Sequence, residues 1–209
     1  MNCIIISIIF VVVGRILYLA SVTTGKPISD YSNGKSALLV IDVQEDTLGI
    51  SQYHNSKGLI ENINKSIKYA SENGIEIVYI KQEYSNIFDL ILTGGMYKAN
   101  SKGASLSGQL IIKSDNVFSK LRSDSFSQKG LEQYLKDKQI NTLYIAGADA
   151  TACVYKTSLG GVNRGYRVVI LNDCIFSANE NVLNKMLKKY EKNGIEIIDV
   201  NDFLHSSIK

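Results

Sequence analysis

The chain of 209 residues contains no tryptophan, one proline, two histidines and three cysteines. Two histidines exclude a histidine-rich metal site. They still allow a Ser-His-Asp triad, but neither His54 nor His205 stands in a motif that supports one. The three cysteines, Cys3, Cys153 and Cys174, lie far apart in the sequence. This spacing predicts no disulfide framework and favours a reducing compartment for the main domain.

The chain also lacks a strong excess of charge and any nucleotide-binding motif. Its formal net charge is only +3, and the lysines are scattered, so we expect no nucleic-acid partner. Neither a P-loop nor a GxGxxG motif is present, and we predict no metal and no cofactor. A hydrophobic content of 45% with 21% charged residues is typical of a folded globular protein.

The first 22 residues form an apolar segment that only Arg15 interrupts. Its length allows a membrane anchor, a cleaved signal peptide, or a strand or helix buried in the protein. We favour an uncleaved transmembrane helix. Because Lys26 and Lys35 follow it, the main domain is then expected on the cytoplasmic side. Secretion or export is the less favoured alternative.

The rest of the chain divides into a linker at residues 23–36 and one domain at residues 37–204. The linker is polar and rich in turn-forming residues. In the domain, apolar runs of strand type alternate with amphipathic segments of helical spacing. We expect strands at 37–42, 75–81, 142–146, 166–173 and 195–200, and helices at 59–72, 130–138, 153–164 and 179–192. This alternation predicts an α/β fold, a three-layer α/β/α sandwich with a mostly parallel, Rossmann-like central sheet.

Cys153 stands just beyond a predicted strand, in the first turn of a predicted helix. Unpaired N–H groups and the positive end of the helix dipole would stabilise a thiolate there. A thiolate is a competent nucleophile, so this position suggests covalent catalysis. The alternative is that Cys153 is a small buried hydrophobic residue.

Two further residues have positions suited to a catalytic site. Asp42 ends a buried apolar strand, where an ionised carboxylate is costly unless it is paired or working. Its alternative role is a cap on the following loop. Lys120, taken alone, has the pattern of an ordinary surface lysine. Asp42 and Cys153 both follow strand ends, where parallel sheets bind their ligands.

Three motifs together resemble one known family. They are DVQED at 42–46, K-x(5)-F at 120–126 and G-x(5)-CV at 147–154, and the run NRGYRVVILNDC follows the last. In this order and spacing they resemble the isochorismatase-like cysteine hydrolases of the nicotinamidase/isochorismatase superfamily. The resemblance covers about residues 36–200.

The resemblance implies a catalytic triad of Asp42, Lys120 and Cys153 and no metal. In such enzymes the aspartate takes the thiol proton, and the sulfur attacks an amide-like C–N substrate to form a thioester. The lysine balances the charge. The resemblance also implies a cis peptide between Ala148 and Asp149 and an oxyanion hole made by the backbone N–H groups of Asp149 and Cys153.

The chain departs from the nicotinamidase pattern after the second strand. That branch carries a metal site of Asp and His there, whereas this chain has Glu83 and Ser85 and no histidine. A metal-dependent nicotinamidase is therefore disfavoured. Thr47 replaces the aromatic residue that often follows DxQxD, which alters one pocket wall. We expect Gln44, Glu83 and Tyr84 to line the pocket, although a solvated loop is the alternative for the last two.

Two other functions stay open at this point. One is a vinyl-ether hydrolase of the isochorismatase type, in which Asp42 acts as an acid. The other is a membrane-tethered scaffold or binding protein that has kept the fold and lost turnover. The expected partners are a small-molecule substrate, a membrane through residues 1–22 and, from the resemblance alone, further copies of the chain. Fast alkylation of Cys153, slowed by Asp42→Asn, would favour the cysteine hydrolase.

Overall fold

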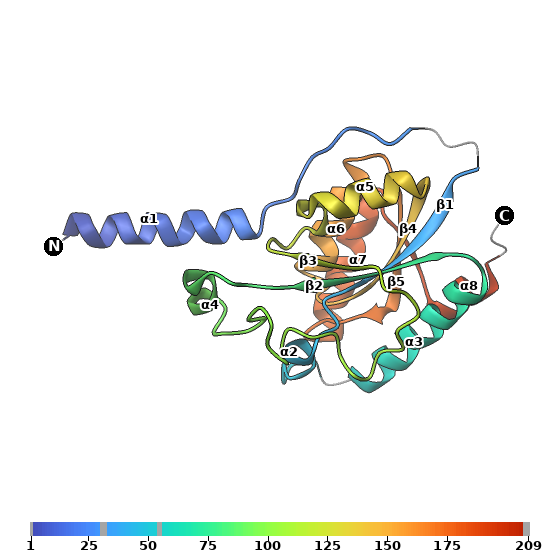
Figure 1. Cartoon of the computed structure of the whole chain (residues 1–209), viewed down its shortest axis with the longest axis horizontal. Helices are drawn as coiled ribbons and strands as arrows, with labels where there is room; N and C mark the ends of the chain where they lie inside the picture. The colour runs from blue at the N-terminus through green and yellow to red at the C-terminus, as the bar shows by residue number, and fades with distance from the viewer. Residues whose placement is uncertain (1, 30–32, 54–55, 207–209) are drawn as a thin grey trace.

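The computed structural model describes residues 2–29, 33–53 and 56–206. Its described strands form one six-stranded sheet in the order β3-β2-β1-β4-β5-β6, and every pair is parallel (Figure 1). The strands are β1 (Lys35–Ile41), β2 (Glu76–Gln82), β3 (Val117–Lys120), β4 (Ile140–Gly147), β5 (Arg167–Ile175) and β6 (Glu196–Ile198). The predicted α/β fold class is confirmed.

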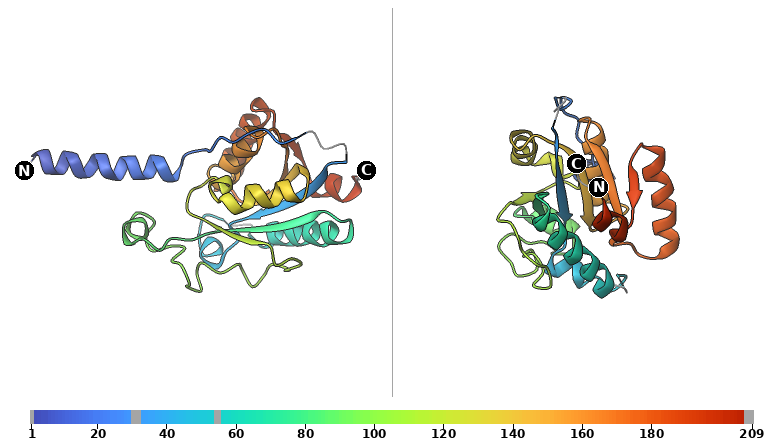
Figure 2. Two further views of the ribbon diagram at one scale, coloured as in Figure 1. Left: turned by 45° about the horizontal axis from the view of Figure 1, so that its top comes forward. Right: turned by 90° about the vertical axis from the view of Figure 1, so that its right-hand side faces the viewer.

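Helices cover both faces of this sheet (Figure 2). The described helices are α1 (Asn2–Leu19), α2 (Glu45–Leu48), α3 (Ser56–Glu72), α4 (Ile87–Leu92), α5 (Lys129–Asp137), α6 (Cys153–Val162), α7 (Glu180–Lys192) and α8 (Val200–His205). Apolar side chains of α3 and α8 pack on one face of the sheet, and those of α5, α6 and α7 pack on the other. The sheet therefore lies between two helical layers.

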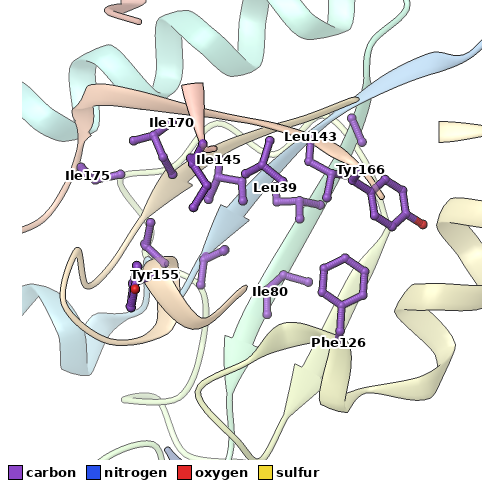
Figure 3. Packing of buried hydrophobic residues seen from close by; sticks show 14 of the residues in the cluster. Leu39, Ile80, Phe126, Leu143, Ile145, Tyr155, Tyr166, Ile170 and Ile175 are labelled. Atoms are coloured by element: carbon purple, nitrogen blue, oxygen red, sulfur yellow. The ribbon is translucent and has the colours of Figure 1, made fainter. Parts of the chain in front are cut away.

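The double covering explains why the strands are continuous apolar runs rather than alternating ones. In β1, Leu38 and Val40 join the core on one face, and Leu39 and Ile41 join the core on the other. All four are fully buried. Figure 3 shows one of these two cores, with labelled side chains at Leu39, Ile80, Leu143, Ile145, Ile170 and Phe126.

Some short elements were not expected from the sequence. β3 has only four residues and lies at the sheet edge, so its apolar pattern is too brief to identify a strand. The 86–108 stretch agrees with its irregular, glycine-containing sequence, because it is mostly loop and contains only the six-residue helix α4. β6 is shorter than expected because α8 begins at Val200.

The expected transmembrane helix is wrong, and so is the membrane-anchored location built on it. No helix in the described residues is long and apolar enough to cross a membrane. α1 has 18 residues, about 27 Å at 1.5 Å per residue. Within α1, the charged Arg15 guanidinium donates two hydrogen bonds of 2.7 and 2.6 Å to Asp89 of α4. α1 projects away from the sheet, and its last turns meet the domain (Figure 1).

The residues after α1 follow the surface of the domain. The N–H of Ser123 donates to the Leu19 carbonyl, and the N–H of Ile28 donates to the Arg164 carbonyl. Between them, the N–H and hydroxyl of Thr23 both donate to Asp124. The predicted linker is thus attached to the domain before β1 begins. The domain boundaries at residues 23, 37 and 204 stay predictions.

Candidate active site

Three side chains from separate parts of the chain meet at the carboxyl edge of the sheet. Asp42 directly follows β1, Lys120 is the last residue of β3, and Cys153 begins α6 just beyond β4. The Lys120 Nζ lies 2.8 Å from Asp42 Oδ2 and 3.3 Å from Cys153 Sγ. Parallel strands end at the same edge, so the topology itself brings these residues together. Because β2 lies between β3 and β1 in the sheet, the Lys120 side chain reaches across the end of β2 to contact Asp42.

Gln82 completes the surroundings of the ammonium group, and sequence reasoning had not selected it. Its Oε1 accepts a hydrogen bond of 2.6 Å from Lys120 Nζ. Its Nε2 donates to the carbonyls of Lys120 and Leu121, at 3.0 and 2.7 Å. Lysine has three N–H donors, and here they serve Asp42, Gln82 and Cys153. The available signal was a buried polar residue at a strand end, the same signal that identified Asp42.

Gln44 lies behind Gln82 rather than at the protein surface. It is fully buried, and its Oε1 accepts from the Gln82 N–H at 2.8 Å. Its Nε2 donates to the carbonyls of Gln82 and Ala104, at 3.0 and 2.7 Å. Gln44 therefore joins β2 to the 101–106 loop. Its predicted place in the pocket wall stays a prediction.

Burial and charge decide where the protons lie. Burial lowers the pKa of Lys120, but the charges of Asp42 and Cys153 outweigh burial, so the ammonium is held above its ordinary pKa. For Cys153, burial is the largest influence and raises the pKa, Lys120 lowers it and Asp42 raises it again. The net result is a pKa of about 12. This shift is opposite to the one expected from the helix N-terminus, and the resting thiol keeps its proton.

Asp42 is placed to receive that proton. Its Oδ2 accepts from Lys120, whereas its buried Oδ1 has no hydrogen-bond partner in the described part of the chain. The residue has a positive φ of 52°, a conformation that is uncommon outside glycine. This backbone turns the chain sharply after β1, and one carboxylate oxygen remains available as a base.

The turn between β4 and α6 leaves two N–H groups unused. The N–H groups of Ala150, Thr151, Ala152 and Val154 all donate within the protein. In the part of the chain that the structure describes, those of Asp149 and Cys153 have no acceptor. The Ala148–Asp149 peptide is cis. Gly147, which starts the turn, has a φ of 118°, and a Cβ there would lie 2.0 Å from the Ile41 carbonyl oxygen.

The Asp149 side chain is anchored on both sides. Its Oδ1 accepts from the N–H and hydroxyl of Thr151, and its Oδ2 accepts from the Tyr53 hydroxyl at 3.1 Å. Tyr53 is itself buried, with its ring edge-on to Phe176 at 5.3 Å between centroids. These contacts hold the peptide unit that presents the free Asp149 N–H.

Two tyrosines stand close to Asp42, Lys120 and Cys153. Burial raises the pKa of Tyr84 to about 12, and the charges of Lys120 and Cys153 also act on it. The Tyr97 hydroxyl lies 3.0 Å from Thr47 Oγ1, so a tyrosine from a distant loop contacts the residue that replaces the usual aromatic. The Tyr84 and Tyr97 ring centroids are 6.5 Å apart.

The other candidate residues have separate environments. Glu83 forms an ion pair of 2.9 Å with Lys81, and both are partly exposed. Cys174 is fully buried, and its Sγ lies 3.7 Å from the Ser66 hydroxyl, in agreement with a packing role. His54 lies outside the described residues. Within the described ranges, no group of three or more His, Cys, Asp or Glu side chains is arranged to hold a metal ion.

Comparison with known proteins identifies relatives of this arrangement. A family model described as the isochorismatase domain matches residues 36–202. The ureidoacrylate amidohydrolase RutB of Acinetobacter baylyi is 26% identical over 177 residues, which cover 69% of this chain and 71% of that protein.

Solved structures share the fold at low sequence identity. An isochorismatase-like hydrolase from Alkaliphilus metalliredigens superposes with a TM-score of 0.73 at 20% identity, covering 83% of this chain and 96% of that one. The nicotinamidase PncA from Bacillus subtilis superposes with a TM-score of 0.71 at 22% identity, covering 79% of this chain and 99% of that one.

Proposed function

Because this chain belongs to the isochorismatase family of hydrolases, we propose that it cleaves an amide-like C–N bond of a small molecule through a thioester on Cys153. The observation that carries the proposal is the Lys120 ammonium, which contacts both Asp42 and the Cys153 sulfur. The names of two similar proteins, an amidohydrolase and a nicotinamidase, support C–N bond cleavage.

The first half-reaction transfers the acyl group to sulfur. Asp42 accepts the thiol proton through its free Oδ1 while the Cys153 Sγ attacks the substrate carbonyl carbon. The N–H groups of Asp149 and Cys153 donate to the oxyanion, and Lys120 balances the negative charge that passes between carboxylate and sulfur. The tetrahedral intermediate then collapses, and Asp42 gives its proton to the leaving nitrogen. A thioester and an amine result.

The second half-reaction restores the enzyme. Asp42, again ionised, accepts a proton from water as the water oxygen attacks the thioester carbonyl carbon. The C–S bond breaks, the departing thiolate takes back the proton, and a carboxylic acid leaves. The same two N–H groups bind both oxyanions. Loss of one such donor typically costs about a hundredfold to a thousandfold in rate.

The high pKa of the thiol has a consequence for this mechanism. Because the resting sulfur is protonated, nucleophilic attack must be coupled to proton transfer to Asp42. The buried ion pair of Asp42 and Lys120, 2.8 Å long, orients the carboxylate. Gln82 acts as a positioning residue, because its Oε1 accepts a hydrogen bond of 2.6 Å from the Lys120 ammonium.

The direct test is hydrolysis of a panel of small amides, ureido acids and nicotinamide by the full chain and by two variants. Cys153→Ala removes the nucleophile and is expected to lower turnover by more than about a thousandfold. Cys174→Ala removes a buried thiol away from the triad and is the matched control. A mass increase equal to the acyl group on Cys153 during turnover identifies the thioester. Full activity of Cys153→Ala would refute the mechanism.

Vinyl-ether cleavage predicts a different result in the same experiment, because it forms no acyl adduct on Cys153. Assembly into a homo-oligomer, expected from the resemblance, stays a prediction.

A further inference from the structure

A cavity that does not include Asp42, Lys120 or Cys153 is lined by residues of the segment that follows α1 and of helix α5. Its volume is about 410 Å³. Thr23 and Thr24 line one side, and Phe126 lines another. Neither Asp42, Lys120 nor Cys153 contributes to its wall. The volume is within the range of small-molecule sites, about 300–1,000 Å³.

The wall of this cavity is strongly basic. Its charged lining residues are Arg122, Lys129, Lys136 and Arg164, with Glu132 as the one acidic residue among those that line it. Glu132 accepts from Lys136 at 2.6 Å and from Arg164 at 2.8 Å. Burial alone would raise the pKa of Glu132, but these two hydrogen bonds outweigh it and the pKa is lowered. Glu132 is therefore an anion already shared by two cations.

The two remaining cations have no carboxylate partner in the described chain. The Arg122 Nη2 donates to the Ser21 hydroxyl at 2.5 Å and to the Ser21 carbonyl at 3.2 Å. Its guanidinium also lies over the Tyr18 ring of α1, 5.0 Å from the ring centroid. Lys129 is exposed at the start of α5 and forms no ion pair in the described residues. Lys129 also lies at the positive end of the α5 dipole, which adds to the local positive potential.

Two lining residues also present buried polar atoms that lack a partner. The Nε of Arg122 and the hydroxyl of Ser127 are buried and form no hydrogen bond within the described chain. Leaving a buried donor unpaired is unfavourable, and a charged donor more so.

We propose that this cavity binds a phosphoryl group, either as free phosphate or as the phosphate of a small phosphomonoester. A phosphoryl group carries about −1.5 to −2 charges at pH 7 and has three or more acceptor oxygens. The lining charges sum to +3, four cations less one anion. Arg122, Ser127 and Lys129 supply the donors, and Arg and Lys are established partners of phosphate in proteins. A bound ligand would contact both α5 and Thr23, so it would also hold the segment before β1.

Binding to the full chain is measured by isothermal titration at constant ionic strength and pH 7.5, with inorganic phosphate and with phenyl phosphate. Saturable binding of at least one of them, with acetate at least tenfold weaker, is the expected result. Tighter binding of phenyl phosphate identifies a phosphomonoester as the ligand class, and equal binding identifies free phosphate. Heat that depends only on ionic strength, or equal binding of acetate, overturns the proposal.

Two variants locate the site. Lys129→Gln is expected to weaken phosphate binding at least fivefold, and Ser127→Ala about threefold. Lys188→Gln, on the exposed surface of α7, removes the same charge elsewhere and is expected to leave the affinity unchanged. Equal weakening by Lys129→Gln and Lys188→Gln would show a general charge effect and would overturn the assignment. Amide hydrolysis is followed in parallel, because these variants leave the triad intact.

Discussion

Replacing Asp42 by asparagine is expected to speed alkylation of Cys153 while abolishing turnover. This reverses the slower alkylation that the sequence alone had led us to expect, because in the structure Asp42 raises the pKa of the thiol. In the structure, burial and Asp42 raise the pKa of the thiol, and Lys120 lowers it. Asparagine removes the negative charge and leaves the ammonium 3.3 Å from the sulfur. The thiolate then becomes the sole anionic partner of Lys120 in the triad. If Asp42 instead lowered the pKa of the Cys153 thiol, its replacement by asparagine would slow labelling.

The expected change in the labelling rate follows from the pKa of the Cys153 thiol. With a thiol pKa of about 12, the thiolate fraction at pH 7 is roughly 10⁻⁵, against about 3% for an ordinary cysteine. Wild-type labelling is therefore expected about a thousandfold slower than that of a free thiol. One neighbouring charge shifts a pKa by about one to three units. Asp42→Asn should accelerate labelling at pH 7 by about tenfold to a thousandfold.

The assay is the rate of iodoacetamide labelling between pH 6 and 11, read by mass spectrometry on the tryptic peptide 139–156. Below the pKa, the wild-type rate should rise about tenfold per pH unit, because the thiolate fraction does. Buried Cys174, on a separate peptide, reports global unfolding. Asp115→Asn makes the same substitution at an exposed position and should leave the profile unchanged.

Either of two results would refute the reasoning. A wild-type labelling pKa below about 8.5 would mean that Lys120 outweighs burial and Asp42 together. Slower labelling in Asp42→Asn would mean that the carboxylate does not hold the proton on sulfur. An unchanged Cys174 signal is required in both cases, since unfolding would expose Cys153 as well.

Two further substitutions test the framework of the site. Gln82→Met removes an acceptor from the Lys120 ammonium and should lower kcat about tenfold or more, with KM little changed, in steady-state kinetics. A rise in KM with kcat unchanged would instead assign Gln82 to substrate binding. Gly147→Ala places a Cβ 2.0 Å from a β1 carbonyl oxygen and should cost about 3 kcal/mol or more, or about 6–12 °C in Tm by calorimetry. Gly194→Ala, whose Cβ meets no atom within 4 Å, is its control, and equal losses would contradict the clash.

Local sequence patterns made Asp42 and Cys153 candidates for the site. Each follows a run of buried apolar residues, and such runs end at the ligand-binding edge of a parallel sheet. Lys120 required the family resemblance, because β3 is a four-residue edge strand without a clear apolar period. Gln82 was missed although it, too, is a polar residue at the end of an apolar strand, because its contacts are with residues 38 positions away in the sequence.

The N-terminal segment shows where hydropathy misleads. Its apolar residues suggested a transmembrane helix. The sequence of the segment alone does not show that Arg15 forms an ion pair with a distant residue. That partner is Asp89, 74 positions away and fully buried. Hydropathy counts the apolar residues of one segment, whereas an ion pair between distant segments is a property of the folded chain.

The sequence by itself determined the order of strands and helices, the two-sided burial of the sheet and the residues that end its strands. These properties depend on hydrophobic periodicity, which is local. Only the tertiary structure decided the distances among Asp42, Lys120 and Cys153, the free N–H groups of the turn and the basic cavity beside α5. Each of these depends on distances between residues far apart in the chain, and electrostatic energies at such short range change steeply with distance and burial.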